Sequence, residues 1–363
     1  MNMNSLYSNV RPPKVFIGFN LQSSIFNLQS VIFLVALLGS ISRAWAVFPD
    51  RRPEPKFTAH RRIEKIMTLD RNDTVVLANQ FGNVVISAWA SSQIKVNAEL
   101  VAGADTKVSA ESCLGCMAVN ATQQGRRITV CSARDKGDCS ATQFQTDLTI
   151  VVPDAVVLTV ENSYGDITIT GVQGVVTATN RFGTTNVHGV RYADVTNAFG
   201  DVNLERVQGF VVRNRVGNVT AHDVTGPIRI TNETGAIRLI RTVGPAQLEN
   251  KFGEVVATDC QGRIEIANSQ GPVTFRQLRV SSDTVRITGR RSALHLKLPA
   301  TASARVNARV VQGSIVCAQP PLNQPAGSSG FDQALSYQFG DGTALFDLES
   351  IGAGITIDME RGK

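Results

Sequence analysis

The stretch NSYGDI (162–167) recurs along the chain in variants that keep its asparagine and the glycine three residues later. The other copies are NRFGTT from Asn180, NAFGDV from Asn197, NRVGNV from Asn214, NETGAI from Asn232, NKFGEV from Asn250 and NSQGPV from Asn268. Successive asparagines are 17 or 18 residues apart. Self-similarity at one short period is typical of a solenoid, in which each repeat buries its apolar face by stacking on its neighbours.

Apolar residues alternate on both sides of each asparagine, but the glycine shifts the alternation by one residue. Val160 and Leu158 precede Asn162 by two and four residues, whereas Ile167 and Ile169 follow it by five and seven. A period of two marks a strand with one buried face, and a shift by one residue would turn a straight strand inside out. We therefore expect the chain to bend at a row of corner glycines, where an unusual backbone angle is easiest. These are Gly165, Gly183, Gly200, Gly217, Gly235, Gly253 and Gly271.

The repeat predicts an all-β fold, a parallel β-helix or β-solenoid with about 18 residues per coil. Neighbouring coils would lie about 4.8 Å apart, and the rest of each coil supplies the connection that parallel strands need. No helical pattern longer than three turns separates the repeats, which argues against a doubly wound α/β fold. The pattern is compatible with either hand of the solenoid.

The repeated asparagine falls in the inward-facing register and predicts a buried amide ladder. A lone buried amide is costly, but amides stacked once per coil can each donate to the carbonyl oxygen of the next. We expect the aromatic residues two positions later to stack beside this ladder as an inner layer, at Tyr164, Phe182, Phe199 and Phe252. The predicted structural ladder consists of Asn162, Asn180, Asn197, Asn214, Asn232, Asn250 and Asn268.

The other segments flank the regular repeats at 157–280. Residues 1–46 have the features of a signal peptide, namely a basic start, the apolar run VIFLVALLGSI (31–41) and AWA (44–46) before the cleavage point; an uncleaved anchor is the alternative. Residues 47–74 would form a linker and first strand, and 75–156 a first coil around Asn79 plus a cysteine-bearing β insertion or cap over the open end. Residues 281–363 predict irregular coils and a cap, with a mobile Pro/Gly/Ser loop at 318–330.

Six cysteines indicate an oxidising compartment. Cys113, Cys116, Cys131 and Cys139 lie close together in the insertion. Two disulfides among these four, with three connectivities open, are favoured over a zinc site because no second CxxC closes the set. Cys260 and Cys317 stand apart at inward positions, and we expect them to be small buried core residues.

The composition is that of a folded protein, with 363 residues, of which 43% are hydrophobic and 18% charged. The net charge is +6, but residues 1–46 contain three basic residues and no acidic one, which leaves 33 basic against 30 acidic residues. This balance, without runs of basic residues alternating with aromatics, does not indicate a nucleic-acid partner.

Two outward rows of the predicted solenoid carry charged residues. Eight residues after successive asparagines come His188, Glu205 and His222, which could bind a divalent metal or an acidic sugar, or form part of a solvated face. One position later the charge alternates in sign, which predicts an ionic ladder between coils. That row consists of Arg206, Asp223, Arg241 and Asp259.

The carboxylates that could support catalysis follow the corner glycines. Asp166, Asp201 and Glu254 share this position, but other residue types interrupt the row. Asp166 and Asp201 would lie two coils, roughly 10 Å, apart, which is wider than the pairs that glycosidases use. We therefore predict no catalytic residues.

Repeated N-aromatic-G-[DE]-[VI] units after an export signal resemble the bacterial putative-adhesin domain family of unknown function. ALHLKLPATASARVNARVVQGSI (293–315) and IGAGITI (351–357) are also similar to the C-terminal part of that family. The resemblance covers roughly residues 57–363 and implies an exported, envelope-associated β-solenoid without agreed catalytic residues. The cysteine-bearing stretch 113–139 and the loss of the asparagine near residue 286 depart from the family pattern.

Together these features predict a non-catalytic exported β-solenoid that presents a rigid surface for adhesion or cell-envelope interaction. We expect no cofactor, no integral membrane domain after signal cleavage, and a glycan or protein at the cell surface as the partner. The expected location is the periplasm, the cell surface or the extracellular space. A carbohydrate-active β-helix enzyme, a polysaccharide lyase or hydrolase, is the alternative.

Overall fold

The computed structural model describes residues 54–70, 72–134, 143–277, 280, 283–320, 322 and 332–360. The described residues all belong to one compact unit, Glu54–Lys363. The predicted signal peptide at 1–46, Cys139 and most of the predicted loop at 318–330 lie outside the described residues.

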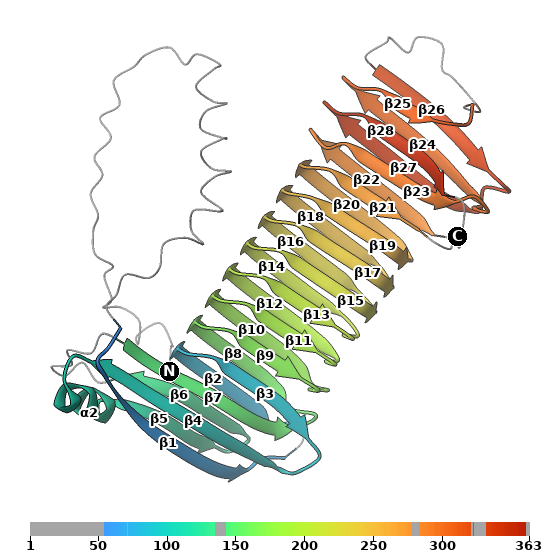
Figure 1. Cartoon of the computed structure of the whole chain (residues 1–363). Coiled ribbons are helices and arrows are strands. Elements are labelled where there is room, and N and C mark those ends of the chain that lie inside the picture. The colour runs from blue at the N-terminus through green and yellow to red at the C-terminus, as the bar shows by residue number, and fades with distance from the viewer. Residues whose placement is uncertain are drawn as a thin grey trace, which may run out of the picture. The chain divides into compact units, whose positions relative to one another are not determined.

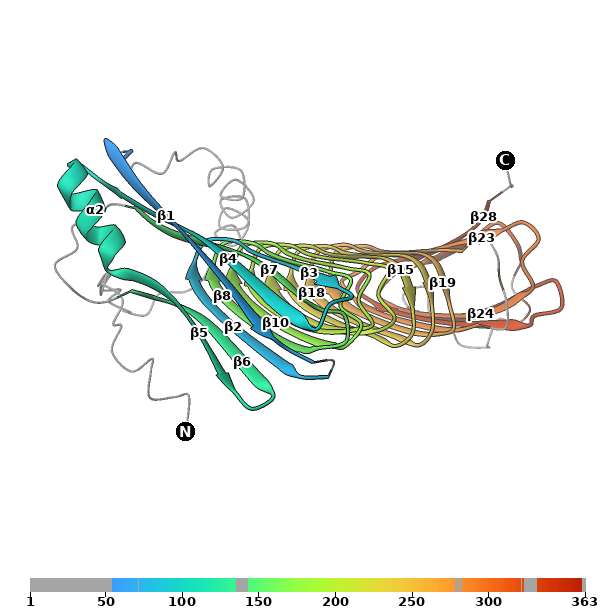
Figure 2. The ribbon, with the colours of Figure 1, turned by 90° about the horizontal axis from the view of Figure 1, so that it is seen from below.

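Each regular coil contributes one strand to each of two sheets that enclose the core (Figures 1 and 2). We call the sheet that contains the repeated asparagines the asparagine sheet. Its regular strands are β8 (Val157–Tyr164), β10 (Val175–Phe182), β12 (Tyr192–Phe199), β14 (Phe210–Val216), β16 (Ile228–Thr234), β18 (Ala246–Phe252) and β20 (Arg263–Gln270). The opposite sheet contains β9 (Ile167–Thr170), β11 (Thr185–His188), β13 (Val202–Glu205), β15 (Val219–Thr225), β17 (Ile237–Val243), β19 (Val255–Gln261) and β21 (Val273–Arg276).

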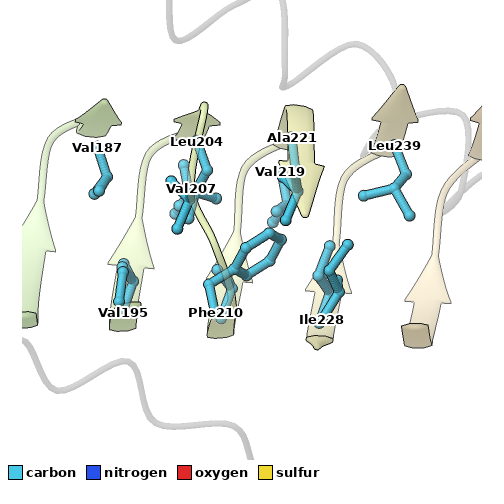
Figure 3. Close-up of a cluster of buried hydrophobic side chains, with 14 of the residues drawn as sticks. Val187, Val195, Leu204, Val207, Phe210, Val219, Ala221, Ile228 and Leu239 are labelled. Carbon is cyan, nitrogen blue, oxygen red and sulfur yellow. The ribbon is translucent and has the colours of Figure 1, made fainter. Parts of the chain in front are cut away.

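All these strands pair in parallel and in register, so equivalent residues of successive coils form rows along the stack. Asn180, for example, pairs with Asn162 on one side and with Asn197 on the other. The predicted parallel β-solenoid is therefore confirmed. The inward rows of the two sheets point toward each other and are buried, as Figure 3 shows for Val195, Phe210 and Ile228 on one side and Val187, Leu204, Ala221 and Leu239 on the other.

The corner between the two sheets is built from glycines stacked on glycines. Gly200 has φ +134°, and a Cβ atom on it would lie 2.1 Å from the carbonyl oxygen of Gly183 in the preceding coil. The other corner glycines of the regular coils repeat this geometry, with φ between +111° and +137° and a Cβ clash at 2.0–2.3 Å. Any side chain at this position would force the coils apart.

The N-terminal part of the described chain, before β8, forms two further coils and a cap. β2 (Thr74–Phe81) and β3 (Val84–Trp89) pair with β8 and β9, and β6 (Arg127–Arg134) and β7 (Gln143–Pro153) stack in parallel on their other side. Beyond them β1 (Phe57–Thr68), β4 (Gln93–Ala104) and β5 (Met117–Gln124) extend the sheets with antiparallel pairing (Figure 2). The helix α2 (Lys107–Gly115) packs against β1 and β4.

The C-terminal coils do not follow chain order. β22 (Thr284–Arg290) and β23 (Leu294–Pro299) continue the stack, but the next coil is made by the end of the chain, β27 (Ala344–Ile351) and β28 (Ile355–Glu360). β24 (Ala304–Val311) and β25 (Ile315–Cys317) lie beyond them, and β26 (Asp332–Phe339) closes the asparagine sheet with antiparallel pairing (Figure 1). The last coil is thus inserted between two earlier ones.

Replacing a corner glycine should be far more damaging than replacing a turn glycine. We expect Gly200→Ala to lower the free energy of unfolding by roughly 3 kcal/mol or more, because it adds both strain at positive φ and a backbone clash. Gly189→Asn is the control: Gly189 has φ +61° and an added Cβ would meet only a backbone nitrogen at 4.0 Å, in a region that asparagine tolerates. Urea denaturation should show a loss for Gly189→Asn of less than about 1 kcal/mol. Equal losses for the two variants would contradict the corner geometry.

Candidate functional surface

The asparagine row is buried and ties each coil to the next. The seven predicted ladder residues are 1–4% exposed. Asn197 Nδ2 donates to Asn214 Oδ1 at 3.2 Å, and this amide-to-amide pattern continues from Asn214 to Asn232 and from Asn232 to Asn250, both at 3.1 Å. Three links therefore have the geometry that the sequence predicts.

Glycine carbonyls accept hydrogen bonds from the asparagines along the whole row, including those whose amides pair. Asn162 and Asn180 both donate to the carbonyl oxygen of Gly165, at 3.0 and 3.1 Å. Asn268 donates to the carbonyl oxygens of Gly253 and Gly271, at 3.1 and 2.7 Å. Each of these asparagines donates to the carbonyl oxygen of its own corner glycine or of the corner glycine in a neighbouring coil. The ladder is therefore a mixed row of amides and corner carbonyls.

The polar residues after the corner glycines cap the next coil. Asp166 Oδ1 accepts the backbone N–H of Thr184 at 2.7 Å, and Asp201 Oδ1 accepts that of Asn218 at 2.7 Å. Asn218 Oδ1 in turn accepts the N–H of Ala236 at 2.9 Å. Asp166 and Asp201, the candidate catalytic carboxylates, are therefore engaged in joining coils.

The predicted metal set is not formed among the described residues. His188 Nδ1 lies 3.3 Å from Glu205 Oε2, but the guanidinium of Arg206 lies 2.6 Å from His188 Nε2 and 3.4 Å from Glu205. His222 is in register beside Glu205. In the part of the chain that the structure describes, no group of three or more His, Cys, Asp or Glu side chains could hold a metal ion. An arginine occupies the place where a cation would bind.

The predicted ionic ladder is only partly formed. Arg241 donates to both carboxylate oxygens of Asp223, at 2.7 and 3.0 Å, and this hydrogen bond holds the pKa of Asp223 below its ordinary value. Arg206 instead pairs with Glu205. All four residues of this row have φ between +51° and +55°, at the turn where two earlier coils have Gly171 and Gly189. These residues therefore have two roles: they adopt the left-handed conformation of a turn, and some of them form ion pairs between coils.

The aromatic row is exposed at the corner, which corrects the predicted inner layer. Phe81, Tyr164, Phe182 and Phe199 stack with centroids 4.9–5.1 Å apart and planes within 8° of parallel. Tyr164 is 43% exposed, and Phe252, farther along, is 49% exposed. The core ends at the asparagine, although the strands and their pairing continue to the aromatic residues directly before the corner glycines. The rings cover one another's faces and present their edges to solvent.

The residues directly after each asparagine form a row that sequence reasoning missed. We call this row, which runs along the same corner, the corner row. It consists of Arg181, Ala198, Arg215, Glu233, Lys251 and Ser269, followed by Arg290 after Gly289, which pairs with Asn268. The basic members are exposed. The signal was present in the repeats as a basic residue in every second copy.

The cysteines do not form the two predicted disulfides. Cys116 and Cys131 are free thiols, whereas Cys113 is disulfide-bonded and Cys139 lies outside the described residues. Cys131 pairs with Asn120 across the hairpin, four residues from Cys116. That separation is roughly 10 Å or more along a strand, whereas bonded cysteines have Cα atoms within about 7 Å.

Cys260 and Cys317 are free, in agreement with the expected unpaired state, and Cys260 is fully buried. Its thiol donates to the carbonyl oxygens of Thr258 and Leu239, at 3.5 and 3.7 Å. Burial raises the pKa of the Cys260 thiol to about 11. Cys317 is partly buried, and burial raises its pKa as well.

A groove of about 520 Å³ crosses the outer face of the C-terminal coils of the asparagine sheet. Its charged residues face one another. Arg286 lies 3.9 Å from Asp347, Arg309 lies 3.9 Å from Glu349, and Asn307 donates to Asp347 at 2.9 Å. Because these charges are paired within the groove, it offers little net charge to a ligand.

Comparisons with known proteins return structural neighbours only. No family model matches the chain, and no curated protein matches it. A putative cell adhesion protein from Clostridium sporogenes is 11% identical, with 83% of this chain and 100% of that chain covered and a TM-score of 0.24. A putative adhesin from Bacteroides fragilis is 9% identical, with 82% and 97% covered and a TM-score of 0.33.

A putative adhesin from Parabacteroides distasonis is 10% identical, with 65% of this chain and 92% of that chain covered and a TM-score of 0.25. The Bacteroides and Parabacteroides proteins are named putative adhesins, as is the family that the repeats resemble. At such TM-scores the likenesses carry no argument about what the chain does.

Among the described residues, no helix has both the length and the apolar character needed to cross a membrane.

Removing one amide from the ladder should destabilise the solenoid. Asn214 donates to Asn232 and to the Gly217 carbonyl and accepts from Asn197. We expect Asn214→Leu to lower the free energy of unfolding by roughly 2–4 kcal/mol, because buried partners lose their hydrogen bonds. Thr196→Leu, on the exposed face of the neighbouring coil, should change it by less than about 0.5 kcal/mol. A melting temperature unchanged by Asn214→Leu would refute the stabilising role of the row.

Thiol reactivity should separate Cys260 from the other free cysteines. Because thiolate is the reactive form and the pKa of Cys260 is about 11, we expect no modification of this residue in the folded protein at about pH 8. Unfolding without reduction should expose the thiols of Cys116, Cys131, Cys260 and Cys317, the free cysteines among the described residues. Titration with a chromogenic disulfide reagent measures both; six thiols in the unfolded chain would contradict the bonded state of Cys113.

Proposed function

We propose that the chain is an exported, non-catalytic β-solenoid that presents a rigid surface for adhesion or cell-envelope interaction. The observation that carries the proposal is the engagement of the outward acids at the corner. Asp166 and Asp201 each accept a backbone N–H of the next coil at 2.7 Å. Residues in that role hold the scaffold together.

Rigidity follows from the same contacts. Buried amides, corner glycines and capping carboxylates join each coil to its neighbours, so equivalent outward residues keep a fixed spacing. A repetitive partner such as a surface polymer could meet the same chemistry at every coil or every second coil. The proposal that the chain is exported depends on the signal-like segment at 1–46. The proposal that its partner is at the cell surface depends in turn on export.

A carbohydrate-active β-helix enzyme is the competing function, and substitutions at Asp201 distinguish the two. Asp201→Asn keeps an oxygen that can accept the N–H of Asn218, as Asn218 itself does for Ala236, but removes the acid–base group. We expect Asp201→Asn to match the parent in stability and in binding to a panel of glycans and matrix proteins. Asp201→Ala should lose about 1 kcal/mol of stability, because one N–H loses its partner.

The decisive measurement is release of reducing ends or unsaturated products from a polysaccharide panel. We expect saturable binding without turnover for the parent and both variants, and recovery of the native protein in the envelope or the medium on cell fractionation. Turnover by the parent that disappears in Asp201→Asn would establish the enzyme instead.

A further inference from the structure

The basic members of the corner row recur at every second coil. Arg181, Arg215, Lys251 and Arg290 are each separated by one coil that carries Ala198, Glu233 or Ser269 at the equivalent place. Two coils span roughly 10 Å. The corner therefore carries a line of positive charges at one regular interval, over seven successive coils of the stack.

The aromatic stack holds two of these guanidinium groups in place. Arg215 lies over the ring of Phe199, 4.9 Å from its centroid, and Arg181 lies 5.3 Å from the centroid of Phe182. Such contacts restrain a long side chain without neutralising it. Among the described residues, no carboxylate forms an ion pair with Arg181 or Arg215. Lys251 lies 3.1 Å from Glu233, so its charge is partly neutralised and it should contribute least to binding an anion.

The row ends at a groove that contains Arg290 and one further cation, Arg291. A hollow of about 480 Å³ at the same corner is lined by the apolar Ile351 and by the polar residues Ser269, Gln270, Arg290, Arg291 and Gln312. Arg290 and Arg291 are exposed, and within the described chain neither pairs with a carboxylate. Amide and hydroxyl groups beside two guanidinium groups suit a ligand that bears both hydroxyls and a carboxylate.

We propose that the corner row binds an extended acidic polysaccharide that carries a carboxylate on every second sugar, with one end of the polymer in the groove at Arg290 and Arg291. This proposal rests on the proposed function and specifies its partner. An extended polymer of this kind repeats its charge on the same length scale as two coils. Each carboxylate then meets one cation of the row, and the sugar between lies over Ala198, Glu233 or Ser269 of the intervening coil; the Glu233 carboxylate is paired with Lys251.

The stacked rings argue against two other partners. Single-stranded nucleic acid binds by stacking its bases on open aromatic faces, but the faces of Tyr164 and Phe182 are covered by neighbouring rings. Neutral glycans that stack on aromatic rings need the same open faces. Charge and hydroxyl recognition is what this corner offers.

The test compares two triple variants of the full chain with the same change in net charge. R181Q/R215Q/R290Q removes the unpaired cations of the row. R127Q/R191Q/R305Q removes three exposed arginines at the starts of strands β6, β12 and β24. These lie on the side of the asparagine sheet where its parallel strands begin, away from the corner row. Hyaluronan, with a uronate on every second sugar, is the probe, and chitin oligosaccharides and single-stranded DNA are the comparison ligands. Melting curves confirm that both variants fold.

We expect hyaluronan to bind the parent, with an affinity that falls as salt rises, and to bind R181Q/R215Q/R290Q at least about tenfold more weakly. The opposite-edge variant should change the Kd by less than about threefold. Equal weakening by both variants, or DNA binding that matches hyaluronan and depends on the row, would overturn the proposal.

Failure of this proposal is distinguishable from failure of the proposed function. Binding of matrix proteins or neutral glycans that the row variant leaves unchanged would overturn the acidic polysaccharide as partner and leave the adhesion scaffold standing. Turnover of a polysaccharide by the parent would overturn the scaffold itself.

Discussion

The contact on which the structure depends is the seating of each corner glycine on the carbonyl group of the corner glycine before it. A Cβ atom at Gly183 would lie 2.2 Å from the carbonyl oxygen of Gly165, so the coils can approach to the strand spacing only if this residue has no side chain. The same carbonyl oxygen accepts hydrogen bonds from Asn162 and Asn180. One backbone group thus sets both the spacing of the coils and the place of the buried amides.

This constraint determines what the surface can offer. Residues just after the glycine are drawn into capping the next coil, as Asp166 caps Thr184. Residues between the asparagine and the glycine lie outside the core and are free of that duty. Their aromatic members stack with ring centroids about 5 Å apart, and each such pair is worth roughly 0.5–1.5 kcal/mol. Their basic members are left exposed on a rigid frame, which is where recognition of a partner can develop.

The alternation of apolar residues was sufficient to predict the coil, its length and its buried rows, because period two and its shift at the glycine have one simple geometric solution. The alternation gave the wrong prediction at Tyr164 and Phe182. Both occupy positions that the alternation assigns to the buried face, but their side chains lie outside the core. The strands run on to Tyr164 and Phe182, but the buried core ends at Asn162 and Asn180, so parity alone does not tell where burial stops. The disulfide prediction failed for a related reason, since closeness of Cys116 and Cys131 in sequence says little about their separation across an antiparallel hairpin.

The sequence by itself determined the repeat, the parallel solenoid and the burial of the asparagine row, because these follow from local periodicity and from the cost of burying an unpaired amide. Tertiary structure alone decided which coil neighbours which at the ends. The pair β27 and β28 lies between β23 and β24 in the stack although it ends the chain, since any coil with the right apolar rows can pair with any other. It also decided the environment of single polar groups. Arg206 excludes a cation from His188 and Glu205, and no one-dimensional pattern encodes that contact.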